Sequence, residues 1–241
     1  MNSLRVVLLA AGSMLAVVSM NAQTADEVVN KHIEALGGKA KLTAIKTVYV
    51  EYDMEVMNNQ ASGISYLVNG KGFRNEIDLG GQKIVQVVTD KGGWGINPMM
   101  GQTTAEAMPE DQVKSSQGQL FVGGPLMDYA TKGNTVELQG RDTLSGVNAY
   151  KLKVKSKDGT ESIMWLDPST YYILKSTSKA TVSGQEVETS AVFSNYKKTE
   201  YGYVMPTNTE LTLPQGFALN ITNKKVEINK EVDPKMFEQP K

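Results

Sequence analysis

The stretch Tyr150-Lys151-Leu152-Lys153-Val154-Lys155 alternates apolar and cationic side chains. Successive side chains of a β-strand point to opposite faces, so this segment has one apolar face and one solvated face. The same alternation recurs from about residue 46 to residue 229. The pattern predicts a large antiparallel sheet, whose apolar face either packs on another layer or surrounds an apolar ligand.

Turn sequences divide this region into about eleven strands. Asn69-Gly70 is a strong hairpin turn, and Gly80-Gly81, Asp158-Gly159 and Ser183-Gly184 mark further turns. No long linker or short-period repeat interrupts the series, which favours a single domain. The strands are expected at 48–56, 64–68, 73–79, 83–89, 135–139, 147–155, 162–166, 171–177, 187–196, 207–213 and 217–228.

A helix is expected before the first strand. Thr24 and Glu27 have the spacing of a capping box, apolar residues follow at helical spacing, and Gly37-Gly38 ends the run. His32, the only histidine, lies one position off the apolar stripe. We therefore expect it on the solvated face of the helix.

Strand alternation disappears between about residues 97 and 132, a segment referred to below as the insertion. Proline and paired glycines punctuate it, and two short helices fit it best, at about 109–117 and 125–131. Methionine is concentrated here; the four residues are Met99, Met100, Met108 and Met127.

The first 22 residues have the pattern of a signal peptide. Arg5 precedes an apolar run over residues 6–20, and Ala22 offers a small residue before Gln23. A run of 15 residues is short for a membrane span, although an uncleaved anchor is the alternative. We expect export, cleavage of residues 1–22, and a soluble periplasmic monomer formed by residues 23–241.

The amino-acid composition limits the classes of partner and of chemical site that the chain can have. The 25 Lys and Arg balance 26 Asp and Glu, so no basic stripe indicates a nucleic-acid partner. One histidine and no cysteine leave little for catalytic triads or zinc sites, and we expect no enzyme, no metal and no cofactor. Ser176-Thr177-Ser178-Lys179 matches the Ser-x-x-Lys pattern, but it lies in a strand-like stretch without the companion Lys-Thr-Gly. A glycosidase-type carboxylate pair remains open.

Three local motifs together resemble the LolA and outer-membrane lipoprotein-sorting family of periplasmic carriers. They are the turn and strand at 89–98 (Thr-Asp-Lys-Gly-Gly-Trp-Gly-Ile-Asn-Pro), Pro125-Leu126-Met127 in the insertion, and the tail at 233–240 with Phe237 before Pro240. The helix ending in Ala35-Leu36-Gly37-Gly38 is similar to the opening of one subgroup. The resemblance covers nearly all of residues 23–241.

This resemblance implies a mainly β fold: an incomplete antiparallel barrel of about eleven strands, with an N-terminal helix and a helical insertion acting as a lid. The family's archetypal carrier has an arginine before a proline at the start of its third strand, which ties the lid shut. Here the stretch reads Asn69-Gly70-Lys71-Gly72-Phe73-Arg74. Lys71 and Arg74 are the cations available for that role.

The resemblance further implies a non-enzymatic periplasmic carrier or chaperone that binds the acyl chains of lipoproteins or other lipids for outer-membrane sorting. Membrane-bound release and acceptor proteins would be its partners. The alternative is a hydrophobic-ligand-binding or sensor module of the same fold without transfer activity. Flexible methionine side chains suit a lid over varied acyl chains.

The residues expected to line the cavity lie on the early strands and in the insertion. Ordinary core packing is the alternative for each of them. They are Val50, Tyr52, Met54, Tyr66, Phe73, Trp94, Met99, Met100, Leu126 and Met127.

Overall fold

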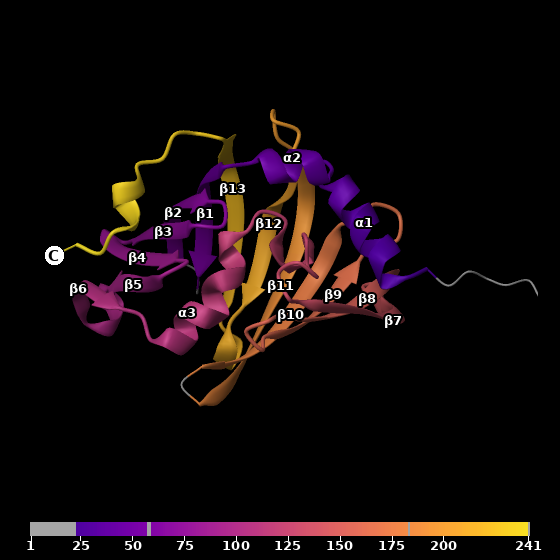
Figure 1. Ribbon diagram of the computed structural model, residues 1–241. Coiled ribbons are helices and arrows are strands. Elements are labelled where there is room, and N and C mark those ends of the chain that lie inside the picture. The colour runs from indigo at the N-terminus through magenta and orange to yellow at the C-terminus, as the bar shows by residue number, and fades with distance from the viewer. Residues whose placement is uncertain (1–22, 57–58, 183, 241) are drawn as a thin grey trace, which may run out of the picture.

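The computed structural model describes residues 23–56, 59–182 and 184–240, and the predicted signal peptide lies outside these described residues. Thirteen strands form one antiparallel sheet that curls without closing (Figure 1). The strands are β1 (Thr47–Val56), β2 (Asn59–Val68), β3 (Gly72–Leu79), β4 (Gln82–Thr89), β5 (Gly92–Asn97), β6 (Gln102–Ala107), β7 (Thr135–Leu144), β8 (Val147–Lys155), β9 (Glu161–Leu166), β10 (Ile173–Val182), β11 (Gln185–Lys198), β12 (Val204–Thr212) and β13 (Ala218–Ile228).

The helical elements are short. They are the α-helices α1 (Ala25–Ala35), α2 (Lys39–Ala44) and α3 (Glu110–Ser116), and the 3₁₀ turns η1 (Pro98–Met100), η2 (Gln117–Leu120), η3 (Gly124–Leu126), η4 (Pro214–Gly216) and η5 (Pro234–Phe237). Within the described part of the chain, no helix has the length and apolarity needed to cross a membrane.

The strand order places the insertion across the open side of the sheet. The order is β6-β5-β4-β3-β2-β1-β13-β12-β11-β10-β9-β8-β7, so the first and last strands pair in the middle. The two edges, β6 and β7, are consecutive in the chain. Residues 108–134, which join these edges and include most of the insertion, must therefore pass from one edge to the other, and Figure 1 shows α3 lying across the sheet.

The two faces of the sheet differ in chemistry. On β1, Val48, Val50 and Tyr52 face one way, and we call that side the inner face; Glu51 and Asp53 lie on the outer face. Helix α1 packs against the β7 end of the sheet, α3 packs against β5 and β10, and the adjoining turn η2 packs on β3 and β4. Val28, Val29 and Ile33 of α1 share one core cluster with Leu152, Val154 and Leu166. Val113 of α3 and Leu120 of η2 share another cluster with Phe73 and Val88.

The predicted fold class is confirmed, with thirteen strands in place of about eleven. The run around Trp94 is β5. The strand missed altogether is β6, because its sequence Gln-Thr-Thr-Ala-Glu-Ala carries no apolar alternation. An edge strand is solvated on one side, so its sequence needs less apolar content than that of a central strand.

The helix predictions are confirmed at α1 and α3 and wrong for the second helix of the insertion. The Thr24–Glu27 capping box is present. Where a helix was expected at 125–131, the chain forms only η3. Gly123 and Asp128 flank η3 with φ of +77° and +51°, and this left-handed backbone cannot continue a helix.

The C-terminal tail returns across the outer face of β3, β4 and β5. Arg74 Nη1 donates to the carbonyl oxygen of Met236 at 2.6 Å. Trp94 Nε1 donates to the carbonyl oxygen of Phe237 at 3.0 Å. The Phe237 ring lies over Gly72, where an added Cβ would come within 2.8 Å of the ring. The tail therefore fastens the end of β13 to the other half of the sheet.

Candidate functional site

A cavity of about 720 Å³ lies between the inner face and the insertion. Its volume falls in the range of roughly 300–1,000 Å³ that is typical of small-ligand sites. It occupies the gap between the area covered by α1 and the area covered by α3. The apolar residues of its wall include Leu36, Val48, Val50, Leu67, Phe73, Phe121, Val122, Leu126, Ile173, Val187 and Phe193.

The insertion is fastened to the turn between β2 and β3. The backbone N–H of Gly70 donates to the carbonyl oxygen of Leu120 at 2.6 Å. Asn69 Oδ1 accepts from the backbone N–H of Val122 at 3.1 Å, and Asn69 Nδ2 donates to the carbonyl oxygen of Ile45 at 3.0 Å. One hairpin turn thus joins the insertion to the loop that precedes β1.

Neither cation considered from the sequence ties down the insertion through its side chain in this structure. Arg74 lies on the outer face, where it pairs with Glu76 at 2.7 Å and stacks 5.4 Å from the centre of the Trp94 ring. Lys71 is exposed in the β2–β3 turn. The side chain of Asn69 holds Val122 instead, and the Gln117 side chain donates to the carbonyl oxygen of Thr89 at 3.1 Å.

One end of the cavity lies under α1 and contains the only histidine. His32 is 2% exposed, so the expected solvated position is wrong. Its Nδ1 lies 2.8 Å from the carbonyl oxygen of Tyr171, which only accepts, so Nδ1 carries the proton. Burial lowers the pKa of His32, which is neutral at pH 7. The sheet and the loop that carries Tyr171 cover a wider arc of α1 than its apolar stripe, so His32 is buried although it lies beside that stripe.

Two tyrosines at the same end are also uncharged. Burial raises the pKa of Tyr203 to about 12, although the side chain keeps some accessible surface because it faces the cavity. Tyr196 donates its hydroxyl hydrogen to the carbonyl oxygen of Ile173 at 2.8 Å, and burial raises its pKa as well. This end of the cavity therefore presents apolar surface and neutral polar groups.

Toward the other end, hydroxyl side chains form a row across three strands. Ser162 of β9 stands opposite Ser178 of β10, and Ser178 stands opposite Thr189 of β11. The hydroxyl oxygens of Ser162 and Ser178 are 2.8 Å apart. All three residues line the cavity, as does Ser176 one step deeper on β10. Beyond the row, the exposed Asp158 marks the rim at the β8–β9 turn.

The ten residues predicted from sequence do not all gather at this cavity. The three that line it are Val50, Phe73 and Leu126. Three others are buried in the adjoining core: Tyr52, Met54 and Met127. The ring of Tyr52 covers Gly63, and the Tyr52 hydroxyl donates to Asn75 Oδ1 at 2.7 Å.

The remaining four lie elsewhere. Tyr66 and Trp94 are on the outer face: Tyr66 packs against Tyr49 at 5.1 Å, and Trp94 lies under the C-terminal tail. Met99 and Met100 sit on η1 at the β5–β6 turn and are 61% and 78% exposed. The strand register explains the position of Trp94. Trp94 pairs with Val87, and Val87 pairs with Arg74, which lies on the outer face.

The sequence reasoning missed the wall formed by β9, β10 and β11. Along β11, Val187, Thr189 and Phe193 face the cavity, whereas Glu188 and Val192 are exposed on the other side. That alternation of side chains along β11 is visible in the sequence. The serines of β9 and β10 carried no apolar signal, so only the structure reveals them as lining residues.

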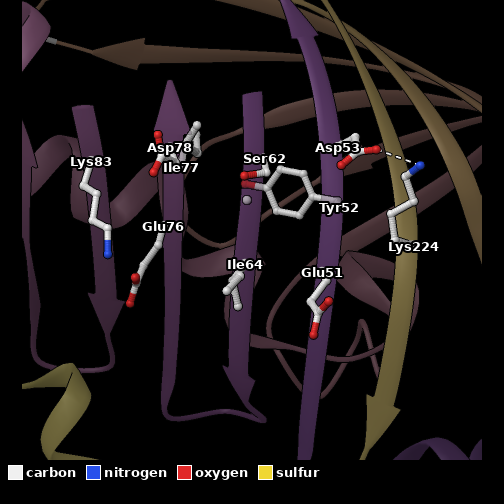
Figure 2. A pocket seen from close by; sticks show the side chains of 11 residues that line it. Glu51, Tyr52, Asp53, Ser62, Ile64, Glu76, Ile77, Asp78, Lys83 and Lys224 are labelled. Atoms are coloured by element: carbon white, nitrogen blue, oxygen red, sulfur yellow. Dashed lines mark ion pairs between the residues drawn. The ribbon is translucent and has the colours of Figure 1, made fainter. Parts of the chain in front are cut away.

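The outer face holds a smaller groove of about 330 Å³ across β1 to β4 (Figure 2). Four carboxylates line it, and each has a partner within the protein. Glu51 accepts from Tyr49, Asp53 pairs with Lys224 at 2.7 Å, Glu76 pairs with Arg74, and Asp78 accepts from the backbone N–H of Gly81 at 2.9 Å. This pairing is typical of a solvated sheet face rather than of an acid–base pair.

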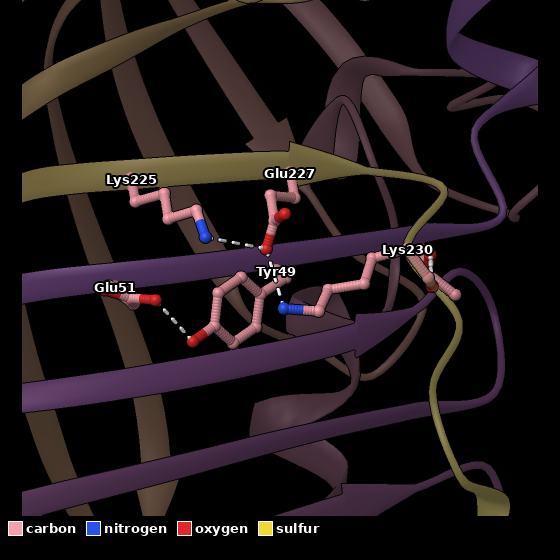
Figure 3. Close-up of polar contacts among 6 residues, drawn as sticks. Tyr49, Glu51, Lys225, Glu227 and Lys230 are labelled. Carbon is pink, nitrogen blue, oxygen red and sulfur yellow. Dashed lines mark hydrogen bonds and ion pairs between the residues drawn. The ribbon is translucent and has the colours of Figure 1, made fainter.

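A neighbouring patch of the same face is built around Tyr49 (Figure 3). Lys230 Nζ lies 3.8 Å from the centre of the Tyr49 ring and 2.7 Å from Glu227, which also pairs with Lys225 at 3.4 Å. Burial raises the pKa of Tyr49, whose hydroxyl donates to Glu51 at 2.7 Å. Exposed ion pairs of this kind contribute little to stability.

The Ser-x-x-Lys match does not assemble a catalytic pair. Ser176 lines the cavity on the inner face. Lys179 is exposed on the outer face, where it pairs with Glu186 at 3.1 Å and with Glu188 at 3.3 Å. An odd separation of three places the two side chains on opposite faces of one strand.

Comparison with known proteins supports the fold. No family model matches the chain, and no curated protein sequence matches it. Among solved structures, a putative outer membrane lipoprotein-sorting protein domain from Vibrio parahaemolyticus is 15% identical, with a TM-score of 0.56 over 88% of this chain and 97% of that one.

Two further structures give a TM-score of 0.60. A LolA superfamily protein from Nitrosomonas europaea is 13% identical over 90% of this chain and 99% of that one. A DUF1329 family protein from Desulfovibrio piger is 14% identical over 90% and 98%. At this identity the likeness shows the fold alone: the chain has the LolA-like fold, an unclosed, mainly β antiparallel sheet with few helices.

Proposed function

We propose that this protein is an exported, non-enzymatic periplasmic carrier that binds the acyl chains of lipoproteins or other lipids. The observation that carries the proposal is the cavity of about 720 Å³ between the inner face and the insertion. Two structural neighbours, a putative outer membrane lipoprotein-sorting protein domain and a LolA superfamily protein, are in agreement with such a role.

The physical argument starts from the cost of moving acyl chains through water. Each methylene gains about 0.8 kcal/mol on leaving water, so a lipid needs an enclosed apolar site to travel in solution. The wall formed by Val50, Phe73 and Phe193 supplies such a surface, and the insertion covers it. The insertion is the cover of this wall, so we expect it to be the segment that shifts when cargo enters. It is fastened at the β2–β3 turn, by the Gln117 side chain to the Thr89 carbonyl oxygen, and by the Lys39–Asp128 ion pair.

The carrier proposal is tested by identifying what the protein retains. We expect the protein, purified without detergent, to carry lipid that native mass spectrometry and solvent extraction detect. The bound lipid should leave when acceptor vesicles are added. Protein that is free of lipid and also fails to bind added acyl compounds would refute the proposal.

The second candidate is a hydrophobic-ligand-binding or sensor module of the same fold. It is favoured by one observation: Arg74 holds the tail on the outer face and not the insertion. A sensor should retain its ligand in the presence of acceptor vesicles, whereas a carrier should release it. The rate of lipid transfer between vesicles therefore separates the two.

A further inference from the structure

The polarity of the cavity changes along its length. The end under α1 is lined by Leu36, Ile173 and Tyr196. Closer to the rim come the hydroxyls of Ser162, Ser178 and Thr189. Along β10 the lining residues are, in order, Ile173, Ser176, Ser178 and Ala180, and Ala180 stands opposite Val187 of β11. The hydroxyls therefore lie between the apolar end of the cavity and a short apolar margin beyond the row.

The hydroxyl row has unused hydrogen-bonding capacity. Within residues 23–56, 59–182 and 184–240, the side chains of Ser176 and Thr189 have no hydrogen-bond partner. In the Ser162–Ser178 pair, one hydroxyl donates to the other, which leaves one hydrogen free. A plain hydrocarbon covering this row would strip water from these hydroxyls and return nothing, which is unfavourable. A ligand oxygen at this depth would accept from them.

The cavity also lacks a cation. Among the described residues, no Lys or Arg lines it. Lys132 contacts the lining residues Gly124 and Phe121, but its ammonium group donates to the Gly124 carbonyl at 3.1 Å and lies 4.4 Å from the Phe121 ring. The one lining carboxylate, Asp158, repels anions. A ligand carboxylate or phosphate would therefore be buried here without a counter-charge, which is costly.

We propose that the cavity takes a neutral acyl ester, with its tail under α1 and its ester carbonyl at the Ser162–Ser178–Thr189 row. This inference rests on the proposed carrier function and names its cargo class. His32, Tyr196 and Tyr203, which are uncharged at neutral pH, are consistent with it. The site therefore discriminates against free fatty acids, which are anions at neutral pH.

The length of the apolar part of the cavity sets the length of the acyl tail that it accepts. Thr189 and Tyr196 are seven residues apart on β11, a distance of about 23 Å at the rise of a strand. A C–C bond of about 1.5 Å advances an extended chain by about 1.25 Å per methylene. Tails of about 16 to 18 carbons match the distance from the hydroxyl row to the apolar end.

The test compares two ligands that share one tail. Binding of 1-monopalmitoylglycerol and of palmitate, each below its aggregation concentration at pH 8, is measured by displacement of the neutral dye Nile red. We expect the ester to bind at least tenfold more tightly than palmitate. Equal or tighter binding of palmitate would overturn the inference, whereas failure of both ligands and of Nile red to bind would overturn the carrier function itself.

Two variants test whether the hydroxyl row causes the preference for the ester over palmitate. Ser178→Ala and Thr189→Val should each weaken ester binding about fivefold, the effect of one neutral hydrogen bond, and leave palmitate and Nile red unchanged. The matched control is Thr177→Val, which changes the neighbouring outer-face residue of β10. If both inner-face variants keep the ester preference of the unaltered protein while their thermal unfolding is normal, the hydroxyl row does not recognise the ligand.

Discussion

The side-chain oxygen of Asn69 accepts a hydrogen bond from the backbone N–H of Val122 at 3.1 Å, across 53 residues of sequence. This contact and the neighbouring Gly70–Leu120 bond attach the insertion to the β2–β3 turn. Val122 lines the cavity. The position of the cavity's cover therefore depends on a turn that also shapes the sheet.

Asn69→Ala should loosen the insertion. The substitution removes the acceptor for Val122 and the donor to Ile45, and we expect about 1–3 kcal/mol of lost stability. Hydrogen exchange should accelerate at the amides of residues 117–126. The control is Asn223→Ala, which removes a comparable bond to the Pro206 carbonyl and should leave the insertion protected. Unchanged exchange over 117–126 in Asn69→Ala would show that the asparagine does not hold the cover.

Arg74→Met should destabilise the protein without loosening the insertion. The guanidinium donates to the Met236 carbonyl and pairs with Glu76, so its loss should cost about 1–3 kcal/mol. Hydrogen exchange should rise over residues 234–239 and stay unchanged over 117–126. Release of bound lipid should keep its rate. Faster release would mean that this arginine governs the cover from the outer face, contrary to the geometry.

Phe193→Asp should abolish lipid loading, and Val192→Asp should not. The two residues are adjacent on β11, but Phe193 lines the cavity while Val192 is 40% exposed on the outer face. A carboxylate in the cavity wall would face the acyl chain without a partner. Native mass spectrometry of the two variants should show at least a tenfold difference in lipid occupancy. Equal occupancy would remove this wall from the binding site.

The sequence predicted the parts of the fold that rest on local chemistry. Alternation located the central strands, and the Thr24–Glu27 pair located the start of α1, because both signals act within a few residues. It could not assign faces across the sheet. Trp94 is large and apolar, yet its register with Val87 turns it toward the tail and away from the cavity.

The candidate site was harder to foresee for the same reason. Val50, Phe73 and Leu126 were found because they are apolar and central. Ser162, Ser178 and Thr189 come from three strands, and only their pairing register brings the hydroxyls into one row. His32 looked solvated on its own helix, and only the Tyr171 backbone and the sheet beneath it make it buried.

Folding stability should fall as the pH drops from 8 to 5, through His32. Burial lowers the pKa of this residue below its ordinary value of 6.5 in the folded protein. Below pH 6.5 the unfolded chain therefore binds more protons than the folded one, so the free energy of unfolding decreases on acidification. One proton accounts for at most about 1.4 kcal/mol per pH unit.

The carboxylates affect a lower range of pH. Ion pairs hold the pKa of Glu110, Glu161 and Glu227 below the ordinary value of 4.5, so the stability they contribute is lost only when the pH falls below that value. Since His32 is the only histidine, the slope between pH 6.5 and 5 is assigned to it. Chemical denaturation at several pH values should show this slope in the unaltered protein and a flat profile in His32→Gln, whatever the absolute stability of the variant. A slope that persists in His32→Gln would place the titrating group elsewhere.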